Sequence, residues 1–304
     1  MLGLGTAVNR GGFVGGAAPA ARLLDTFSGA AASYSLRLLS NSYSGSAVQI
    51  RRSSDNVEVD VSFDNNGVVS LDSAVTNVTE ETTGSSTSIL TRAVNLGEFV
   101  ANASYTDADS LGSTDSATVQ CWYDQSSNSN DATQDTAGSQ PTIVSSGALV
   151  TDNGKPAFTS TGQTSLSFTQ ISDINSVFLV LRPTHFIHNY LSFILGDSSN
   201  YDYHSGGDGK WLNNPYADPV VRDGDNYLNG TSVNLTTLNR SAGQYVLSMI
   251  HTANTAVASR ISADRNISGR SWVGNLQELI IYSDGKTDQR TDIETNINTF
   301  YDIF

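Results

Sequence analysis

The stretch VEVDVSF, residues 57–63, alternates apolar and polar side chains at every step. Successive side chains of a β-strand point to opposite faces, so strict alternation predicts a strand with one buried and one solvated face. Similar alternation occurs at residues 33–39, 47–51 and 117–123, and clusters of Ser, Asn, Asp and Gly separate the runs. These segments are therefore predicted to form half-buried antiparallel strands.

Two later runs, residues 176–181 and 244–250, are more continuously apolar, which is typical of central strands that are covered on both faces. Helical spacing of apolar residues predicts a short helix over residues 91–103 and a second, C-terminal helix over residues 287–301. Many strands, few helices and abundant turn residues predict an all-β fold. We expect a two-sheet antiparallel jelly-roll sandwich with these two helices added.

Composition excludes several classes of function. The 304 residues are 38% hydrophobic and 15% charged, which is enough apolar material for one large core. Sixteen Lys and Arg against thirty Asp and Glu give a net charge of −14, so the protein repels nucleic-acid phosphates and anionic lipid surfaces. The longest apolar runs are far shorter than the roughly 20 residues that span a bilayer. Cys121 is the single cysteine, which excludes an intramolecular disulfide.

The N-terminal segment is rich in glycine and alanine. It lacks the continuous apolar core and leading positive charge of a secretion signal. We expect residues 1–30 to form an extended arm and residues 31–304 to form the sandwich domain. The arm is expected to dock on a neighbouring subunit of a large assembly, with packing on its own domain as the alternative. Its apolar contact residues would be Leu2, Leu4, Val8, Phe13 and Val14.

Three passages carry family resemblances. Residues 34–39 with 43–56 (YSLRLL and YSGSAVQIRRSSDN) and residues 122–134 (WYDQSSNSNDATQ) resemble the catalytic-domain family of arabinofuranosidase B. The closing segment GNLQELIIY, residues 274–282, with the helix after it, is similar to concanavalin-like, laminin-G-like domains of tailed-phage structural proteins. Both resemblances imply a concanavalin-like jelly roll.

The resemblance also implies where an active site would lie. Such arabinofuranosidases use a Glu nucleophile and an Asp acid/base about 5 Å apart. Asp264 matches the acid/base region, but residues 222–228, which match the nucleophile region, contain no glutamate. Asp223 or Asp225 would have to act in its place, and the disulfides of the family cannot form with one cysteine. A glycoside hydrolase is therefore the alternative function, together with a carbohydrate-binding module.

The main functional prediction is a non-enzymatic structural protein of a phage virion, displayed as a head or tail appendage. Its expected partners are other virion proteins, contacted through the arm, further copies of itself, and a host surface glycan. A tail fibre would be a trimer, whereas a capsid decoration protein would spread its arm over capsid subunits. Neither of these two roles is favoured by the sequence, and no cofactor is expected apart from an optional calcium ion.

The turn at residues 124–135 is the candidate calcium loop. Asp124, Ser126, Asn128 and Asp135 place side-chain oxygens at spacings that suit a hard cation. The alternative is that these residues satisfy the hydrogen bonds of their own turn.

The loop at residues 201–211 combines aromatic and short polar side chains, which suits stacking on a sugar ring and hydrogen bonding to its hydroxyls. In the alternative interpretation, Tyr203 and Trp211 anchor an ordinary loop to the sandwich. The candidate glycan-binding residues are Tyr201, Tyr203, His204, Asp208 and Trp211.

Overall fold

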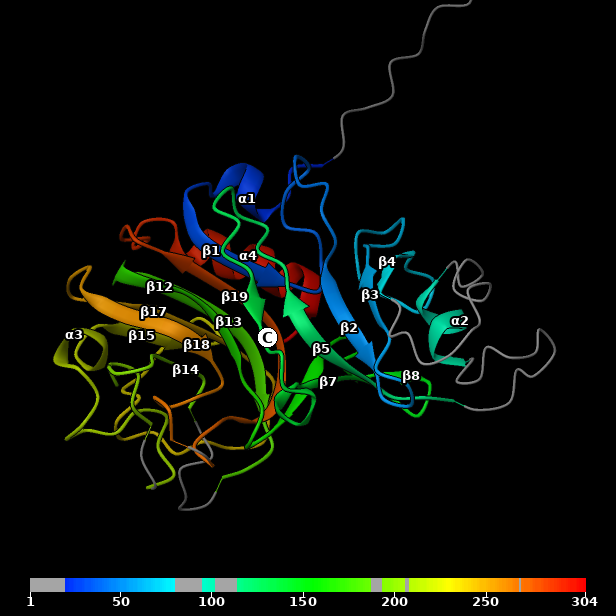
Figure 1. Cartoon of the computed structure of the whole chain (residues 1–304). Coiled ribbons are helices and arrows are strands. Elements are labelled where there is room, and N and C mark those ends of the chain that lie inside the picture. Colours follow the sequence, from blue (N-terminus) through cyan, green and yellow to red (C-terminus); the bar gives the residue numbers. More distant parts are fainter. Residues whose placement is uncertain (1–19, 80–94, 102–113, 187–192, 206–207, 268) are drawn as a thin grey trace, which may run out of the picture.

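Antiparallel strands make up most of the regular structure (Figure 1). The computed structural model describes residues 20–79, 95–101, 114–186, 193–205, 208–267 and 269–304, with the backbone alone at 77–79. The elements are α1 (Leu23–Thr26), β1 (Ala30–Ser35), β2 (Val48–Arg52), β3 (Glu58–Val61), β4 (Val75–Thr79), α2 (Leu96–Ala101), β5 (Ala117–Trp122), β6 (Ala132–Thr133), a 3₁₀ turn (Ala137–Ser139), β7 (Thr142–Ser145), β8 (Ala148–Leu149), β9 (Thr151–Asp152), β10 (Lys155–Pro156), β11 (Phe158–Thr161), β12 (Leu166–Ile174), β13 (Ser176–Pro183), β14 (Leu195–Gly196), α3 (Pro219–Arg222), β15 (Asp225–Leu228), β16 (Thr231–Ser232), β17 (Tyr245–Ile250), β18 (Ala256–Ile261), β19 (Val273–Tyr282) and α4 (Arg290–Tyr301).

The main core lies between two facing halves of one curled sheet. Hydrogen bonds connect seventeen strands into a continuous ladder, and β9 and β10 form a separate hairpin. Apolar side chains of β2, β5, β12 and β18 meet those of β13, β17 and β19 in a single buried cluster. The predicted all-β sandwich is confirmed, and the alternation at residues 57–63 corresponds to β3 and the residues beside it.

A second core lies on the other face of β13, β17 and β19. Along β13, Val177, Leu179 and Leu181 face the main core, whereas Phe178 and Val180 face α1 and α4. The same division occurs in β17 and β19, and Figure 1 shows both helices on one side of these strands. The central strands are covered on both faces, as their continuous apolar runs predict.

The two helices that the sequence predicts are present, and the structure adds the short helices α1 and α3. The apolar stripe of the C-terminal segment forms α4, with Ile293, Ile297 and Tyr301 buried, and α2 lies inside the predicted segment at residues 91–103. Residues 20–30, which the sequence places in the arm, form α1 and the first residue of β1, and Leu23 and Phe27 are buried in the second core. None of the helices in the described segments is long and apolar enough to cross a membrane.

Candidate functional site

Two exposed tyrosine rings flank a buried histidine in the connection between β14 and β15. Tyr201 and Tyr216 are 46% and 58% exposed, whereas His204 is 5% exposed. The ring centroid of His204 lies 6.1 Å from that of Tyr201 and 5.3 Å from that of Tyr216. Phe193 packs edge-on against the same imidazole at 4.9 Å, and burial lowers the pKa of His204, which keeps it neutral at pH 7. The surface thus offers two aromatic rings that pack against a buried imidazole.

Each exposed tyrosine is closely followed by an aspartate, and the fold brings the two aspartates together. Asp202 is the neighbour of Tyr201, and Asp218 lies two residues after Tyr216. The backbone N–H of Asp218 donates a hydrogen bond to the backbone carbonyl of Asp202 at 3.1 Å. Both side chains are half-buried. We name Tyr201, Asp202, His204, Tyr216 and Asp218 the tyrosine–aspartate site.

The environments of the two carboxyl groups differ. Asp202 Oδ2 accepts a hydrogen bond from the backbone N–H of Val257 in β18 at 2.8 Å, and Asp218 Oδ1 accepts one from Val220 and caps α3. Burial raises the pKa of Asp202, the Val257 hydrogen bond opposes this, and the negative charges of Asp218 and Asp197 add to it. The net effect is a pKa of Asp202 above its ordinary value, a property that carboxylic acids acting as general acids share.

Asp264 holds a pair of arginines at the edge of this site. Its buried carboxylate accepts hydrogen bonds from Arg265 Nε at 2.9 Å and Arg270 Nη1 at 3.0 Å. Burial raises the pKa of Asp264, but the two arginine hydrogen bonds outweigh burial and the pKa lies below its ordinary value. The Arg265 guanidinium in turn lies 5.0 Å from the ring centroid of Tyr201. Asp264 therefore positions Arg265 against the tyrosine.

The structure does not bring Asp264 together with the two aspartates that the sequence pairs with it. Asp225 lies opposite Ile250, close to the corner where β12 turns into β13. Asp264 follows Ile261, at the other end of β18, and the strand rises about 3.3 Å per residue between the two ends. Asp223 is exposed and paired with the arginine that precedes it. This geometry does not support a carboxylate pair of Asp264 with Asp223 or Asp225.

The predicted glycan-binding residues divide into three groups. Tyr201 and His204 belong to the tyrosine–aspartate site, whereas Asp208 accepts a hydrogen bond from the backbone N–H of Lys210. Tyr203 and Trp211 are buried and line a small apolar cavity with leucine and methionine side chains of β17. The prediction that Tyr203 and Trp211 contact a glycan is corrected by their burial, and the alternative, that they anchor the loop, describes them.

The candidate calcium loop is a self-satisfied turn. Asp124 Oδ2 accepts hydrogen bonds from the Ser126 hydroxyl at 2.6 Å and the Asn130 backbone N–H at 2.9 Å, and Oδ1 accepts two backbone N–H groups. Asn128 donates to carbonyls of β1, and Asp135 accepts from a glutamine of β5. Within the described ranges, no three or more His, Cys, Asp or Glu side chains are grouped to hold a metal. The calcium prediction gains no support from this geometry.

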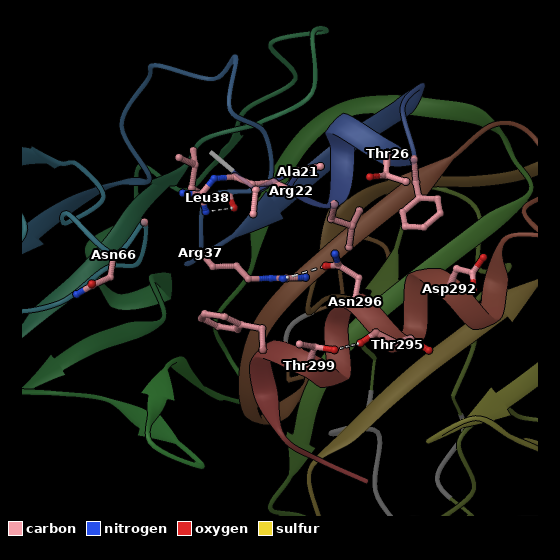
Figure 2. Close-up of a pocket in the computed structure, with 15 residues that line it drawn as sticks. Ala21, Arg22, Thr26, Arg37, Leu38, Asn66, Asp292, Thr295, Asn296 and Thr299 are labelled. Atoms are coloured by element: carbon pink, nitrogen blue, oxygen red, sulfur yellow. Dashed lines mark hydrogen bonds between the residues drawn. The ribbon is translucent and has the colours of Figure 1, made fainter. Parts of the chain in front are cut away.

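A cleft of about 660 Å³ lies between α1 and α4, away from the loop that the sequence singles out (Figure 2). Residues from both ends of the described chain form its walls, together with the turn at Asn66 and Gly67. The arm residues Leu2, Leu4, Val8, Phe13 and Val14 lie outside the described residues, so their docking stays a prediction.

Sequence reasoning missed Asp202, Tyr216 and Asp218. The signal that was available is a repeated pattern, in which a tyrosine precedes an aspartate by one residue at Tyr201 and by two at Tyr216. Only the backbone hydrogen bond between the two segments shows that the patterns meet.

Similar solved structures belong to the glycoside hydrolases with a β-sandwich domain. No protein-family model matches the sequence, and no curated protein is significantly similar to it. A GH54 α-L-arabinofuranosidase mutant soaked with 4-nitrophenyl α-L-arabinofuranoside is similar at a TM-score of 0.50 and 16% identity. An arabinofuranosidase complexed with arabinofuranosyl-α-1,2-xylobiose is similar at a TM-score of 0.46 and 15% identity. Each match covers 88% of this chain and 62% of the other, so the chain spans less than two thirds of their length.

These matches change the functional expectations. At 16% identity the likeness establishes the fold alone. It agrees with the resemblance to arabinofuranosidases, but nothing in the comparisons indicates a phage virion protein. The prediction that the protein performs no chemistry is contradicted, because a solved structure that is similar in fold is a glycoside hydrolase soaked with an arabinofuranoside. We do not retain it.

Proposed function

We propose that this chain is a glycoside hydrolase that releases arabinofuranosyl groups at the tyrosine–aspartate site. The observation that carries the proposal is the backbone hydrogen bond that joins Asp202 and Asp218, each of which lies within two residues of an exposed tyrosine. The similarity of the fold to GH54 α-L-arabinofuranosidases supports the substrate class.

The tyrosines supply the binding surface. A sugar ring has an apolar face and a rim of hydroxyl groups, and exposed Tyr201 and Tyr216 offer flat apolar surfaces for that face. Arg265, stacked on Tyr201 and fixed by Asp264, supplies donors for the hydroxyl rim. The ligand is therefore held by stacking on the tyrosines and by hydrogen bonds from Arg265.

The two aspartates divide the chemistry. Asp202, with its raised pKa, donates its proton to the leaving oxygen as the glycosidic bond breaks. The negative charge of Asp218 stabilises the positive charge that develops on the sugar ring. Water then adds to the anomeric carbon and returns a proton to Asp202, so that the enzyme is regenerated. The general acid contributes most where the leaving group is poor.

The test compares two substrates in three variants. Asp202→Asn is expected to lower kcat on arabinofuranosyl-xylobiose about 100-fold or more, and to have a smaller effect on 4-nitrophenyl α-L-arabinofuranoside, whose leaving group needs no proton. Asp218→Asn is expected to lower kcat on both substrates. Asp223→Asn, which removes an exposed carboxylate outside the site, serves as the control and should match the wild type.

Two results would overturn the proposal. One is a wild-type protein that hydrolyses neither substrate, and the other is full activity in both Asp202→Asn and Asp218→Asn. Equal losses of Asp202→Asn on both substrates would remove the proton-donor role and leave a positioning role.

A further inference from the structure

The cleft between α1 and α4 lies outside the tyrosine–aspartate site and has walls from four segments. Residues 20–27 form one wall and α4 forms the facing wall (Figure 2). Arg37 and Leu38, together with Asn66 and Gly67, close the remaining sides. Its volume of about 660 Å³ falls within the range of about 300–1,000 Å³ that small-molecule sites occupy.

The α4 wall is a stripe of hydrogen-bonding side chains. Asp292, Thr295, Asn296 and Thr299 follow the spacing that places residues on one helix face. The hydroxyls of Thr295 and Thr299 donate to helix carbonyls at 2.7 Å, so the lone pairs of these oxygens stay available to accept from a ligand. Asn296 Oδ1 accepts from Arg37 Nη1 at 3.1 Å, which fixes the amide with Nδ2 as a donor.

Electrostatics favour an uncharged ligand. Arg37 is neutralised by Glu278, with Nε to Oε2 at 2.7 Å and Nη2 to Oε1 at 2.9 Å. Arg22 uses Nε and Nη1 to hold Asn41 and the Leu38 carbonyl. Asp292, on the opposite wall, carries the opposite charge to Arg22. A ligand with one net charge would therefore gain little in this cleft.

Apolar side chains complete the lining. Leu23 and Phe27 from the α1 side and Phe300 from α4 border the cleft. The cleft combines hydroxyl, amide and aromatic groups, and its charged side chains cancel one another. This combination recognises sugars, which carry both hydroxyls and apolar ring faces.

We propose that this cleft is an accessory carbohydrate-binding site that holds a neutral stretch of the polysaccharide on which the proposed hydrolase acts. The substrate class rests on the proposed function. The cleft raises the affinity for the polymer without taking part in bond cleavage.

The experiment uses a pair of matched substitutions on α4. Thr299→Trp fills the cleft from an exposed position, and Thr291→Trp places the same side chain on the exposed surface of α4 outside the cleft. Affinity electrophoresis in soluble arabinoxylan measures polymer binding, and hydrolysis of 4-nitrophenyl α-L-arabinofuranoside measures the other site. Thermal unfolding of each variant shows that it is folded, and Thr299→Ala repeats the test with a change too small to disturb packing.

Thr299→Trp is expected to weaken binding to arabinoxylan at least tenfold and to leave hydrolysis of the small substrate unchanged, whereas Thr291→Trp changes neither. Wild-type retardation in Thr299→Trp would overturn the accessory site, and so would a wild type that cleaves the small substrate without being retarded by the polymer. If the wild type is retarded by arabinoxylan in a way that depends on Thr299 but hydrolyses no substrate, the proposed function is overturned and the accessory binding site is supported.

Discussion

Glu278 shows how one buried carboxylate ties the sheet to the C-terminal helix. It lies in β19 and is fully buried, and it accepts hydrogen bonds from Arg37, from the Ser35 hydroxyl at 2.8 Å and from the Tyr301 hydroxyl of α4 at 3.2 Å. Removing one partner of a buried ion pair leaves an uncompensated charge, which costs more than the intact pair contributes. The network is therefore sensitive to single substitutions and tolerant of paired ones.

Arg37→Met is expected to lower the free energy of unfolding by about 3–5 kcal/mol, because Glu278 loses its cation while still buried. The double variant Arg37→Met, Glu278→Leu should recover most of this loss. Urea unfolding of the wild type and both variants measures the coupling. A double variant no more stable than Arg37→Met would contradict this account.

The ionised Asp202 side chain is expected to lower the free energy of unfolding at pH 7. Its pKa is raised in the folded protein, so the folded state binds the Asp202 proton more tightly than the unfolded state and stability falls as the pH rises above the unfolded pKa. Asp202→Asn should raise the melting temperature at pH 7 and leave it unchanged near pH 3. Calorimetry at the two pH values checks the sign, and a lower melting temperature at pH 7 would refute it.

At the scale of elements, α4 is held by its apolar stripe. Ile297 is buried in the second core against β13, β17 and β19. Ile297→Ala should lower the free energy of unfolding by about 2–5 kcal/mol, since the substitution removes apolar contacts and leaves a cavity. Thr291→Ala, on the exposed side of the helix, is the matched control, with an expected change within about 0.5 kcal/mol. Equal effects of both substitutions would show that α4 does not pack as described.

The sequence predicted those elements whose buried faces follow directly from the spacing of apolar residues. Continuous apolar runs predicted β13 and β17 as doubly covered strands, and helical spacing predicted α4, because both patterns follow from which faces are buried. The prediction that Tyr203 and Trp211 contact a glycan lacked such a pattern, and only the alternative interpretation placed them in the core. Polar neighbours suggested an exposed loop, whereas the loop turns inward at these two residues. Local polarity does not reveal which aromatic residue of a loop is buried.

Pairings between distant segments were beyond the sequence. A single backbone hydrogen bond joins Asp202 to Asp218. The cleft forms where residues 20–27 lie opposite α4. Neither contact produces a periodic pattern of apolar and polar residues that the sequence could reveal. Asp264 was noticed through a family resemblance, but the partners assumed for it lie near the other end of β18.

At the scale of the whole molecule, the rate at which a reagent labels the Cys121 thiol measures global unfolding. Cys121 is 4% exposed in β5, and burial raises the pKa of its thiol, so the reactive thiolate is scarce in the folded state. Labelling by a thiol reagent should be slow in the native protein and should speed up in Ile297→Ala by the same factor by which the equilibrium constant of unfolding rises. Fast labelling of the native protein would show that β5 opens locally.

The pairing of β1 with β19 has a consequence for the newly made chain. Ser35 of β1 and Glu278 of β19 are 243 residues apart, yet they share a hydrogen bond. Non-local strand pairing slows folding because long loops must close first. As the ribosome releases the chain from its N-terminus, Ser35 of β1 cannot bond to Glu278 until the 243 residues up to Glu278 have been synthesised. Until β19 is made, the backbone groups with which β1 pairs to it are open to water or to another chain.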